Sequence, residues 1–547
     1  MTNSSVPLSP ISDAAVLTMR QWLSECDQNH VKCKSIIAGA QEASCTLPTR
    51  LLDIGNNVSS RIQLVDSKEV SGEIKYVSLS HCWGTSRKMC LLQDNMRLCK
   101  QVIHFDDLPR TFRDAIVLCR ILGVRYLWID SLCIIQDCTD DWKKESGRMG
   151  SVFENSLFTI AASRAAGDEY GFLGPRQVLE PSAARNIDLV HELSKGILLV
   201  SASSDSVWRF ISPHASSPLS SRAWVVQERL LARKSIAFAT TGMQWSCRSV
   251  LLEESGRPSY SATENIGAIL DRLTTKVESA VVTQVGQSIA THNQYGAYEL
   301  WYRVVEQYTG CAITKFTDRL PALAGIVGQI ALQTQQKYYA GVWEHCLIPG
   351  LLWQTLSATD LDYYRAPSWS WASVNGEVLY RTATGDKILA TVDSISTDTD
   401  PLAPYGEVSG GVLQISAYAA ATVGGTCAQS HSQSISAKCV DETFAFEISY
   451  DTEQRCANLG TLYLLPLVYR IQGFPSCPHR MRVWITALAV VQESKDLYQR
   501  VGIATSHFPR TPTKGEEWPD VGSVNSPTDW WIEDFLEKLP RSNITII

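Results

Sequence analysis

The chain lacks the segments that would place it in a membrane or direct it to secretion. No run of 18 or more apolar residues occurs, and the N-terminal MTNSSVP has neither the basic stretch nor the apolar stretch of a secretory signal. We therefore expect a soluble, cytoplasmic protein with no membrane partner.

Net positive charge is lacking as well. The 49 Lys and Arg residues are outnumbered by 56 Asp and Glu residues, which gives a formal net charge of -7. Such a chain has no general attraction for a phosphate backbone, so we do not expect nucleic acid as a partner. The sequence contains neither a Walker-type loop nor a GxGxxG loop, which argues against an ATPase and a Rossmann dehydrogenase.

Closely paired cysteines are a third absence. The 16 cysteines are scattered singly along the chain and include no CxxC pair. In a chain of this length, such spacing is more typical of free, buried thiols in a reducing compartment than of a disulfide framework.

One group of cysteines nevertheless raises the question of a metal. Cys26, His30 and Cys33 lie at positions i, i+4 and i+7 of residues 12–33, a segment whose apolar residues follow helical spacing. Zinc is the functional alternative for this set, with Cys45 as a fourth ligand. Three ligands spread over two turns of one helix converge poorly on a tetrahedral ion, so we predict a packed helical face and no metal site.

The residue pattern changes several times along the chain. At 547 residues, of which 45% are hydrophobic, the chain is longer than one core usually supports. Alternating strand and helix patterns give way to mostly helical ones, and strand patterns dominate after Trp371. We predict an N-terminal helical flank (1–60), an α/β domain (61–250), a mostly helical region (251–370) and a β-rich C-terminal module (371–547).

In the α/β region, strands alternate with helices of ten to fifteen residues, which implies crossover connections and a mainly parallel sheet. The helix that begins near Pro109 should stop at Gly123, as expected for a C-terminal glycine. The expected helices are 109–122, 139–153 and 222–231, and the expected strands are 61–65, 76–79, 126–129, 158–161 and 235–239.

Two of these strands run directly into polar and aromatic residues. The first lies in YVSLSHCWG (76–84) and the second in YLWIDSLCIIQD (126–137). Because the carboxyl ends of parallel strands meet at one edge of a sheet, where ligands usually bind, we predict a site there. The predicted binding residues from these two segments are Ser80, His81, Trp83, Gly84, Asp130, Cys133 and Gln136.

The two segments, together with SRAWVVQERLL (221–231), resemble in order and spacing the three blocks of the fungal heterokaryon-incompatibility (HET) domain. The motifs WLxxCxxxHxxC (22–33) and RAPSWSW (365–371) look like flanks common in stand-alone members of this family. The resemblance implies a role in fungal nonself recognition and programmed cell death. It also implies self-association or other incompatibility proteins as partners.

HET domains are similar in arrangement to Toll/interleukin-1 receptor (TIR) domains, whose enzymatic members cleave the nicotinamide bond of NAD with a helix-borne glutamate. Trp224 and Glu228 look like the tryptophan and the catalytic glutamate of that pattern. The likeness implies a flavodoxin-like fold, with Glu228 as the catalytic residue and Arg222 and Trp224 in the binding site. NAD or a related nucleotide would then be the substrate. No cofactor is indicated. Glycosidic cleavage requires a carboxylate near the anomeric carbon, and Glu228 can supply it.

Each residue also has a structural alternative. Glu228 can be a solvated or arginine-paired glutamate, Trp83 a core residue that closes the end of the sheet, and Asp130 a helix cap. His81 and Cys82 are neighbours on a strand and point to opposite faces, so they do not form a nucleophile and base pair. Two other functions stay open: a non-catalytic signalling scaffold and a HET-fold protein recruited to secondary-metabolite biosynthesis.

Overall fold

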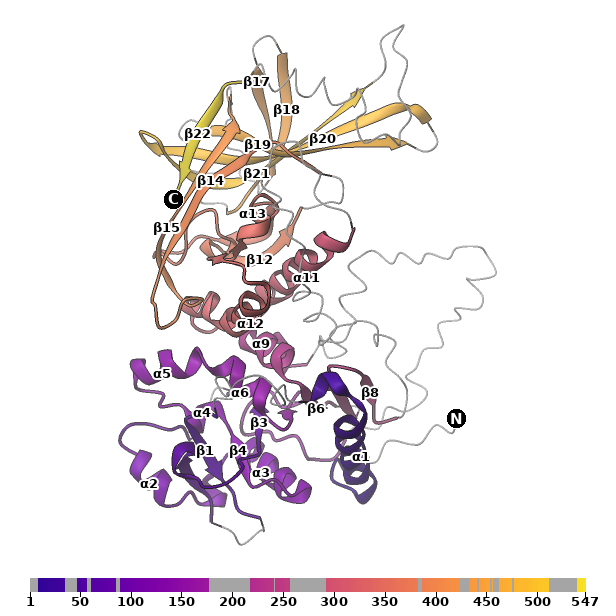
Figure 1. The fold of residues 1–547 in the computed structure, drawn as a ribbon, viewed down its shortest axis with the longest axis vertical. Helices are drawn as coiled ribbons and strands as arrows, with labels where there is room; N and C mark the ends of the chain where they lie inside the picture. The colour runs from indigo at the N-terminus through magenta and orange to yellow at the C-terminus, as the bar shows by residue number, and fades with distance from the viewer. Residues whose placement is uncertain are drawn as a thin grey trace. The chain divides into compact units, whose positions relative to one another are not determined.

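The computed structural model divides the chain into two compact units, which are described separately (Figure 1). Unit 1 comprises Met1–Arg272, Cys311–Ile313 and Ala322–Ile326, and unit 2 comprises the remainder. The structure describes residues 8–34, 47–56, 61–84, 89–176, 217–240, 242–255, 292–381, 386–422, 432–439, 442–452, 455, 462–474, 477–510 and 539–547.

Unit 1 is built on an eight-stranded sheet with the order β2-β1-β4-β3-β5-β6-β7-β8. Its central strands β4, β3, β5 and β6 are parallel, whereas the outer strands pair antiparallel. The α/β class is therefore confirmed, but the sheet is parallel only at its centre. The strands are β1 (Arg50–Asp53), β2 (Gln63–Asp66), β3 (Tyr76–Ser80), β4 (Tyr126–Trp128), β5 (Thr159–Ala161), β6 (Lys234–Phe238), β7 (Met243–Cys247) and β8 (Leu251–Glu253).

Helices cover both faces of this sheet, which explains why β3 and β4 are buried along their whole length. On one face, Trp128 of β4 packs edge-on against Phe153, with ring centroids 5.6 Å apart. On the other, the ring of His81, just beyond β3, packs against Phe112 at 5.1 Å. The helices and 3-10 turns are α1 (Asp13–Asn29), η1 (Val31–Cys33), η2 (Ser67–Glu69), α2 (Met96–Gln101), η3 (Phe105–Asp107), α3 (Arg110–Leu122), α4 (Asp130–Cys133), α5 (Thr139–Ser146), α6 (Met149–Asn155), η5 (Leu219–Ser221) and α9 (Ala223–Leu231).

Helix α3 ends as the sequence predicts, because Gly123 adopts the left-handed conformation with φ of 78°. The single helix expected over 139–153 is instead two helices, α5 and α6. Gly147 follows the last residue of α5, and glycine is a poor helix former, which gives a physical reason for the break.

Helix α1 is also shorter than expected. Ser12 caps its N-terminus by accepting a hydrogen bond from the Ala15 amide at 3.3 Å, and Trp22 and Cys26 lie on its buried face. The helix ends at Asn29, because His30 is extended (φ -102°, ψ 95°) and a separate 3-10 turn, η1, follows. The segment 12–33 is therefore not one continuous helix.

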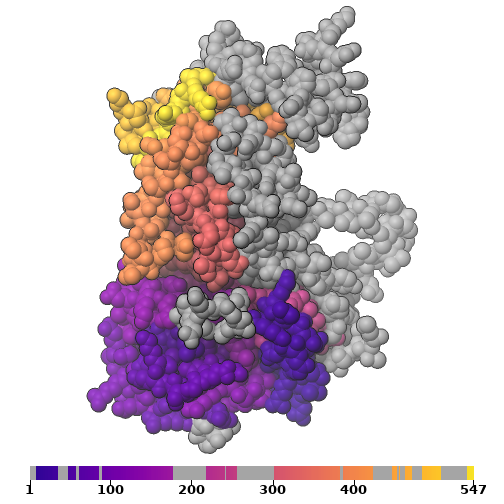
Figure 2. Space-filling view, in the orientation of Figure 1, coloured from indigo at the N-terminus to yellow at the C-terminus, as the bar shows by residue number. Residues whose placement is uncertain are grey.

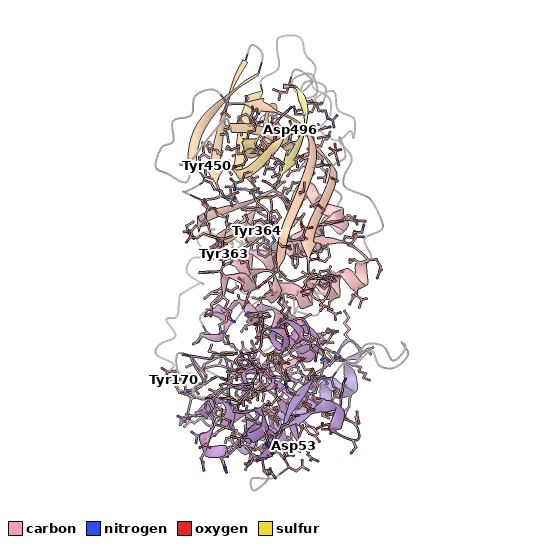
Figure 3. All side chains as sticks on the ribbon, turned by 90° about the vertical axis from the view of Figure 1, so that its left-hand side faces the viewer. Asp53, Tyr170, Tyr363, Tyr364, Tyr450 and Asp496 are labelled. Carbon is pink, nitrogen blue, oxygen red and sulfur yellow. The ribbon has the colours of Figure 1, made fainter. Side chains whose placement is uncertain are left out.

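Strand β1, which lies between β2 and β4, is attached to the sheet by an ion pair as well as by its backbone. Arg125 donates hydrogen bonds to both carboxylate oxygens of Asp53, at 2.9 and 2.8 Å (Asp53 is labelled in Figure 3). The strand belongs to the segment that we expected to be a helical flank, but it extends the sheet instead.

Unit 2 combines helices with a large, almost entirely antiparallel sheet, as the strand patterns after Trp371 predict. The strand β14 lies at the edge of this sheet and is partly exposed (orange in Figure 2). Residues Ala322–Ile326, which lie in η7 and at the start of α12, belong to unit 1. The elements before this sheet in the chain are α11 (His292–Thr309), η6 (Phe316–Arg319), η7 (Pro321–Leu323), α12 (Ala324–Thr334), β9 (Tyr338–Tyr339), β10 (Val342–Trp343), η8 (Glu344–Cys346), α13 (Leu347–Gly350), β11 (Trp353–Thr359), η9 (Trp371–Ser373) and β12 (Asn375–Tyr380). The sheet contains β13 (Lys387–Ile388), β14 (Thr391–Thr399), β15 (Val408–Tyr418), β16 (Ala420–Ala421), β17 (Ser432–Cys439), β18 (Glu442–Tyr450), β19 (Leu462–Phe474), β20 (Cys477–Ser494), β21 (Leu497–Arg510) and β22 (Arg541–Ile546).

A fully buried ion pair lies in the core of unit 2. Arg500 and Asp451 are both 0% exposed, and the guanidinium donates to the two carboxylate oxygens at 2.9 and 3.1 Å. The same guanidinium donates to the carbonyls of Leu351 and Trp353, at 2.6 and 2.5 Å, and stacks over the Trp353 ring at 3.4 Å. Arg500 therefore connects β21 with the segment that leads into β11.

Candidate functional site

The three segments that the sequence analysis singled out meet at the carboxyl edge of the parallel strands in unit 1. Ser80, the last residue of β3, donates a hydrogen bond from its Oγ to Oε2 of Glu228 on α9, at 2.5 Å. Trp83 donates from Nε1 to Oδ2 of Asp130, just beyond β4, at 2.8 Å. Residues far apart in the sequence thus form one polar cluster.

The turn after β3 depends on Gly84. Its φ is 70°, a conformation that other residues rarely adopt. A Cβ at this position would also come within 3.0 Å of Gly167 Cα. Gly84 was predicted as a binding residue, and the neighbour that approaches its backbone here is the backbone of Gly167.

His81 lies between two acids in the interior of unit 1. Its side chain is 1% exposed, its Nε2 is 3.1 Å from Asp168 Oδ1, and its Nδ1 is 3.7 Å from Asp130 Oδ1. Burial alone would lower the pKa of His81, but the charges of Asp130 and Asp168 raise this pKa above its usual value. Arg222 donates a hydrogen bond from Nη1 to the His81 carbonyl, which ties the start of α9 to the end of β3.

The Glu228 carboxyl is 5% exposed and has a strongly shifted pKa. Burial raises this pKa from the ordinary 4.5 to about 7, and the charge of Arg222 and the Ser80 hydrogen bond oppose the shift only in part. Near neutral pH, Glu228 is therefore divided between its protonated and ionised forms. Such a pKa is typical of carboxyls that take part in catalysis.

Glu228 faces a pocket between α9 and one face of the sheet. Because side chains alternate along a strand, every second residue of β5, β6 and β7 points into it. These residues align in two rows across the strands. All but the glutamine are small, which leaves a cavity of about 80 Å³. The Glu228 pocket is lined by Thr159, Ala161, Ser235, Ala237, Gln244 and Ser246 from the strands, by Val225, Glu228, Arg229 and Ala232 from α9 and the residue after it, and by Ser80, Ser163, Ser217, Leu219, Ser220 and Leu251.

Arg229 brings positive charge to this pocket. Its Nε is buried and has no hydrogen-bond partner among the residues that the structure describes. Burial lowers the pKa of Arg229, although a guanidinium remains charged at neutral pH. An anionic group that entered the pocket would compensate this charge.

Several predicted site residues lie outside the pocket lining. Cys133 belongs to the core, where burial raises the pKa of its thiol to about 12, so the thiol is not an activated nucleophile. Gln136 donates to the carbonyls of Asp130 and Ile134, at 3.3 and 3.0 Å. Trp224 packs against Trp142, with ring centroids 5.7 Å apart. Of the predicted residues, Ser80 and Glu228 line the pocket. The remaining members of the polar cluster lie near Glu228 without lining the pocket; they are His81, Trp83, Asp130 and Arg222.

Asp168, Ser163 and the strand residues of the pocket were not predicted from the sequence. Ser163 and Asp168 follow β5, the next parallel strand beside β3, so the rule that found Ser80 and Asp130 also applies to them. The Asp168 carbonyl accepts a hydrogen bond from the Thr111 amide at 2.8 Å, which fixes this loop at the start of α3. The pocket residues of β7 belong to an antiparallel strand, and their spacing in the sequence gives no signal for them.

Part of the chain matches a known protein family. Residues 76–228 match the family model described as heterokaryon incompatibility protein (HET), which begins at β3 and ends at Glu228. No curated protein and no solved structure matches the chain. In the part of the chain that the structure describes, no helix is both long and apolar enough to cross a membrane. Residues 76–228 of this chain therefore form a domain of the heterokaryon-incompatibility (HET) family.

Proposed function

We propose that this HET domain hydrolyses the N-glycosidic bond of NAD or of a related nucleotide, with Glu228 as the catalytic carboxylate. The family match indicates a function related to heterokaryon incompatibility. We propose that the reaction promotes cell death in this process. The observation that carries the proposal is the buried Glu228 carboxyl, which is bonded to Ser80 and faces a pocket lined by hydroxyl groups.

In the proposed step, the bond between the ribose C1′ and the nicotinamide nitrogen breaks, and its electron pair leaves on the nitrogen. The ribosyl centre becomes oxocarbenium-like, and the ionised Glu228 carboxylate stabilises its positive charge. Water then adds to C1′ and releases a proton, so the products of NAD are nicotinamide, ADP-ribose and one proton. Burial strengthens the attraction between carboxylate and ribosyl centre, because little water is present to screen it.

The size and polarity of the pocket favour one ring or sugar over a whole dinucleotide. A cavity of 80 Å³ has room for roughly five to eight water molecules. The hydroxyl groups of Thr159, Ser235 and Ser246 are suited to ribose hydroxyls, and the Arg229 guanidinium is suited to a phosphate. We propose that the ribose attached to nicotinamide enters this pocket, with its phosphate near Arg229.

The polar cluster behind the pocket has a positioning role in this proposal. Ser80 holds the Glu228 carboxylate through its hydroxyl, and Arg222 connects α9 to the His81 carbonyl one residue further along. His81 in turn lies between Asp130 and Asp168, which stabilise its charged form. The cluster thus keeps Glu228 in one place at the edge of the sheet.

The order of the parallel strands supports the TIR-like, flavodoxin-like part of the proposal. Numbered along the chain, the spatial order β4-β3-β5-β6 becomes 2-1-3-4, as in the first four strands of a flavodoxin-like sheet. Ligands of such sheets bind where the strand order reverses, which here is between β3 and β5. Ser80 ends β3 at this position and is paired with Ala161 of β5.

Nicotinamide release by the purified full chain tests the proposal. We expect incubation with NAD to yield equal amounts of nicotinamide and ADP-ribose, measured by liquid chromatography. We also propose that self-association, which the family resemblance implies, activates the chain. The rate per chain should then increase with protein concentration. Protein that releases no nicotinamide above the protein-free control, at any concentration and from neither NAD nor NADP, would contradict the proposal. The signalling scaffold or a biosynthetic role would then be preferred.

A further inference from the structure

Three cysteines and one histidine form a cluster in unit 1, on the opposite face of β7 from the Glu228 pocket. The ligand atoms of Cys26, His30, Cys33 and Cys247 all lie within 4.8 Å of one another. Cys247 follows Ser246 directly, and neighbours on a strand point to opposite faces, so the cluster does not share the pocket to which Ser246 contributes.

The distances and the donor set fit a tetrahedral zinc ion. With Zn–S near 2.3 Å and Zn–N near 2.0 Å, neighbouring ligand atoms of a tetrahedron are roughly 3.5–3.8 Å apart. Nδ1 of His30 is 3.4 Å from Sγ of Cys247. Three cysteines and one histidine are a common set for structural zinc, and soft thiolates do not suit magnesium or calcium.

The path of the chain explains how these side chains converge. Cys26 and His30 lie one turn apart, at the end of α1 and just beyond it, and η1 then reverses the direction of the chain and brings Cys33 back. Our expectation against a metal assumed that all three residues lie on one helix, and that assumption is wrong. The fourth residue is Cys247, at the end of β7, whereas Cys45 lies outside the described residues.

The turn between β7 and β8 supplies hydrogen-bond donors that favour thiolates. The Val250 amide donates to Cys247 Sγ at 3.4 Å, and the Ser249 hydroxyl lies 3.7 Å from Cys33 Sγ. Groups that surround the ligands of a metal in this way orient them and stabilise their charge. Cys26, Cys33 and Cys247 are all buried and form no disulfide, so their thiols are available as ligands.

We propose that Cys26, His30, Cys33 and Cys247 bind one structural Zn²⁺ ion that fastens α1 to the β7–β8 edge of the sheet. All four positions of the ion are filled by protein, so the site has no open position for catalysis. Binding releases the protons of the three thiols. The ion adds to two existing contacts of α1 with the sheet, namely the packing of Trp22 on Trp245 of β7 and the ion pair of Asp27 with Lys234 of β6.

Metal analysis of the full chain tests this site. The protein is expressed with zinc in the growth medium and purified under reducing conditions. We expect it to contain about one zinc per chain, measured by inductively coupled plasma mass spectrometry. The double variant Cys33→Ser/Cys247→Ser should contain at least tenfold less. Cys99→Ser is the matched control, because Cys99 is also buried and free but lies in α2, and this variant should keep its zinc.

Cobalt provides a test that needs no variant. Co²⁺ added to metal-free wild-type protein should give the intense visible absorption of tetrahedral coordination, together with thiolate charge-transfer bands. Three results would overturn the proposal: wild-type protein that takes up no zinc, cobalt bands of octahedral coordination only, or a disulfide between two of these cysteines in protein isolated without oxidant. Equal zinc contents in wild-type protein and the double variant would overturn it as well.

Discussion

Glu228→Gln is expected to reduce nicotinamide release from NAD by about 10³-fold, a typical cost of removing a positioned charge or acid from an active site. Glutamine has nearly the same shape as glutamate, and its side-chain oxygen can still accept the Ser80 hydrogen bond. It carries no negative charge, so it cannot stabilise the ribosyl centre. Initial rates measured by chromatography at saturating NAD give the comparison.

A second buried glutamate provides the control for this variant. Glu145 is 3% exposed and accepts a hydrogen bond from Thr49 at 2.6 Å, but it does not line the pocket. Glu145→Gln is expected to keep the wild-type rate once its folding has been confirmed by circular dichroism. Equal rates in wild-type protein and Glu228→Gln would remove Glu228 from the mechanism.

The same variant separates an enzyme from a scaffold in cells. If the chain kills by degrading NAD, Glu228→Gln loses toxicity and nicotinamide release together. A variant that loses release but still kills would indicate that toxicity depends on recruitment of partners. Metabolite profiles of cells with and without the protein distinguish the biosynthetic alternative.

Arg500→Leu is expected to lower the free energy of unfolding of unit 2 by roughly 3–5 kcal/mol, because it leaves a buried partner charge uncompensated. Asp451 is 0% exposed and, among the described residues, its carboxylate would keep only Arg455, whose Nη1 is 3.3 Å from Oδ2. The carbonyls of Leu351 and Trp353 would also lose their donor. Urea unfolding of the full chain, followed by tryptophan fluorescence, measures the change.

An exposed arginine of the same sheet is the control. Arg541 lies on β22, where its guanidinium is 5.8 Å from the Tyr418 ring. Arg541→Leu is expected to change stability by no more than about 0.5 kcal/mol, as is usual for surface positions. An Arg500→Leu protein with wild-type unfolding behaviour would mean that the buried pair is not important for stability.

The part of the fold that the sequence predicts well is the part set by local patterns. Apolar runs that end in polar residues identify β3 and β4, and Gly123 ends α3 because glycine adopts the left-handed conformation easily. The break between α5 and α6 was missed, since the apolar residues on either side of Gly147 still follow helical spacing.

The part of the site that the sequence predicts is likewise limited to strand ends. The carboxyl ends of parallel strands lie at the same edge of a sheet, which is why Ser80 and Asp130 could be placed together from the sequence. Glu228 was found through the family resemblance. The pocket face also includes β7, which pairs with the preceding strand β6, and no strand was predicted over Met243–Cys247.

The cysteine cluster illustrates the same limit. Cys26, His30 and Cys33 are visible as a spacing, but Cys247 is more than two hundred residues away and joins them only through the fold. Helical periodicity suggested a continuous helix, whereas the extended backbone of His30 ends it. The end of a helix is difficult to predict when no glycine or proline marks it.

The most direct test of the account compares the stabilities of wild-type protein and Glu228→Gln as a function of pH. Folding raises the pKa of Glu228 from 4.5 to about 7, so the folded state holds a proton that the unfolded state has released. Wild-type stability should therefore fall by roughly 3 kcal/mol relative to the variant as the pH rises from 4.5 to 7, and the difference should remain constant above that range. A stability difference that does not change with pH would mean that Glu228 is not a buried carboxyl at this site, and the proposed chemistry would lose its basis.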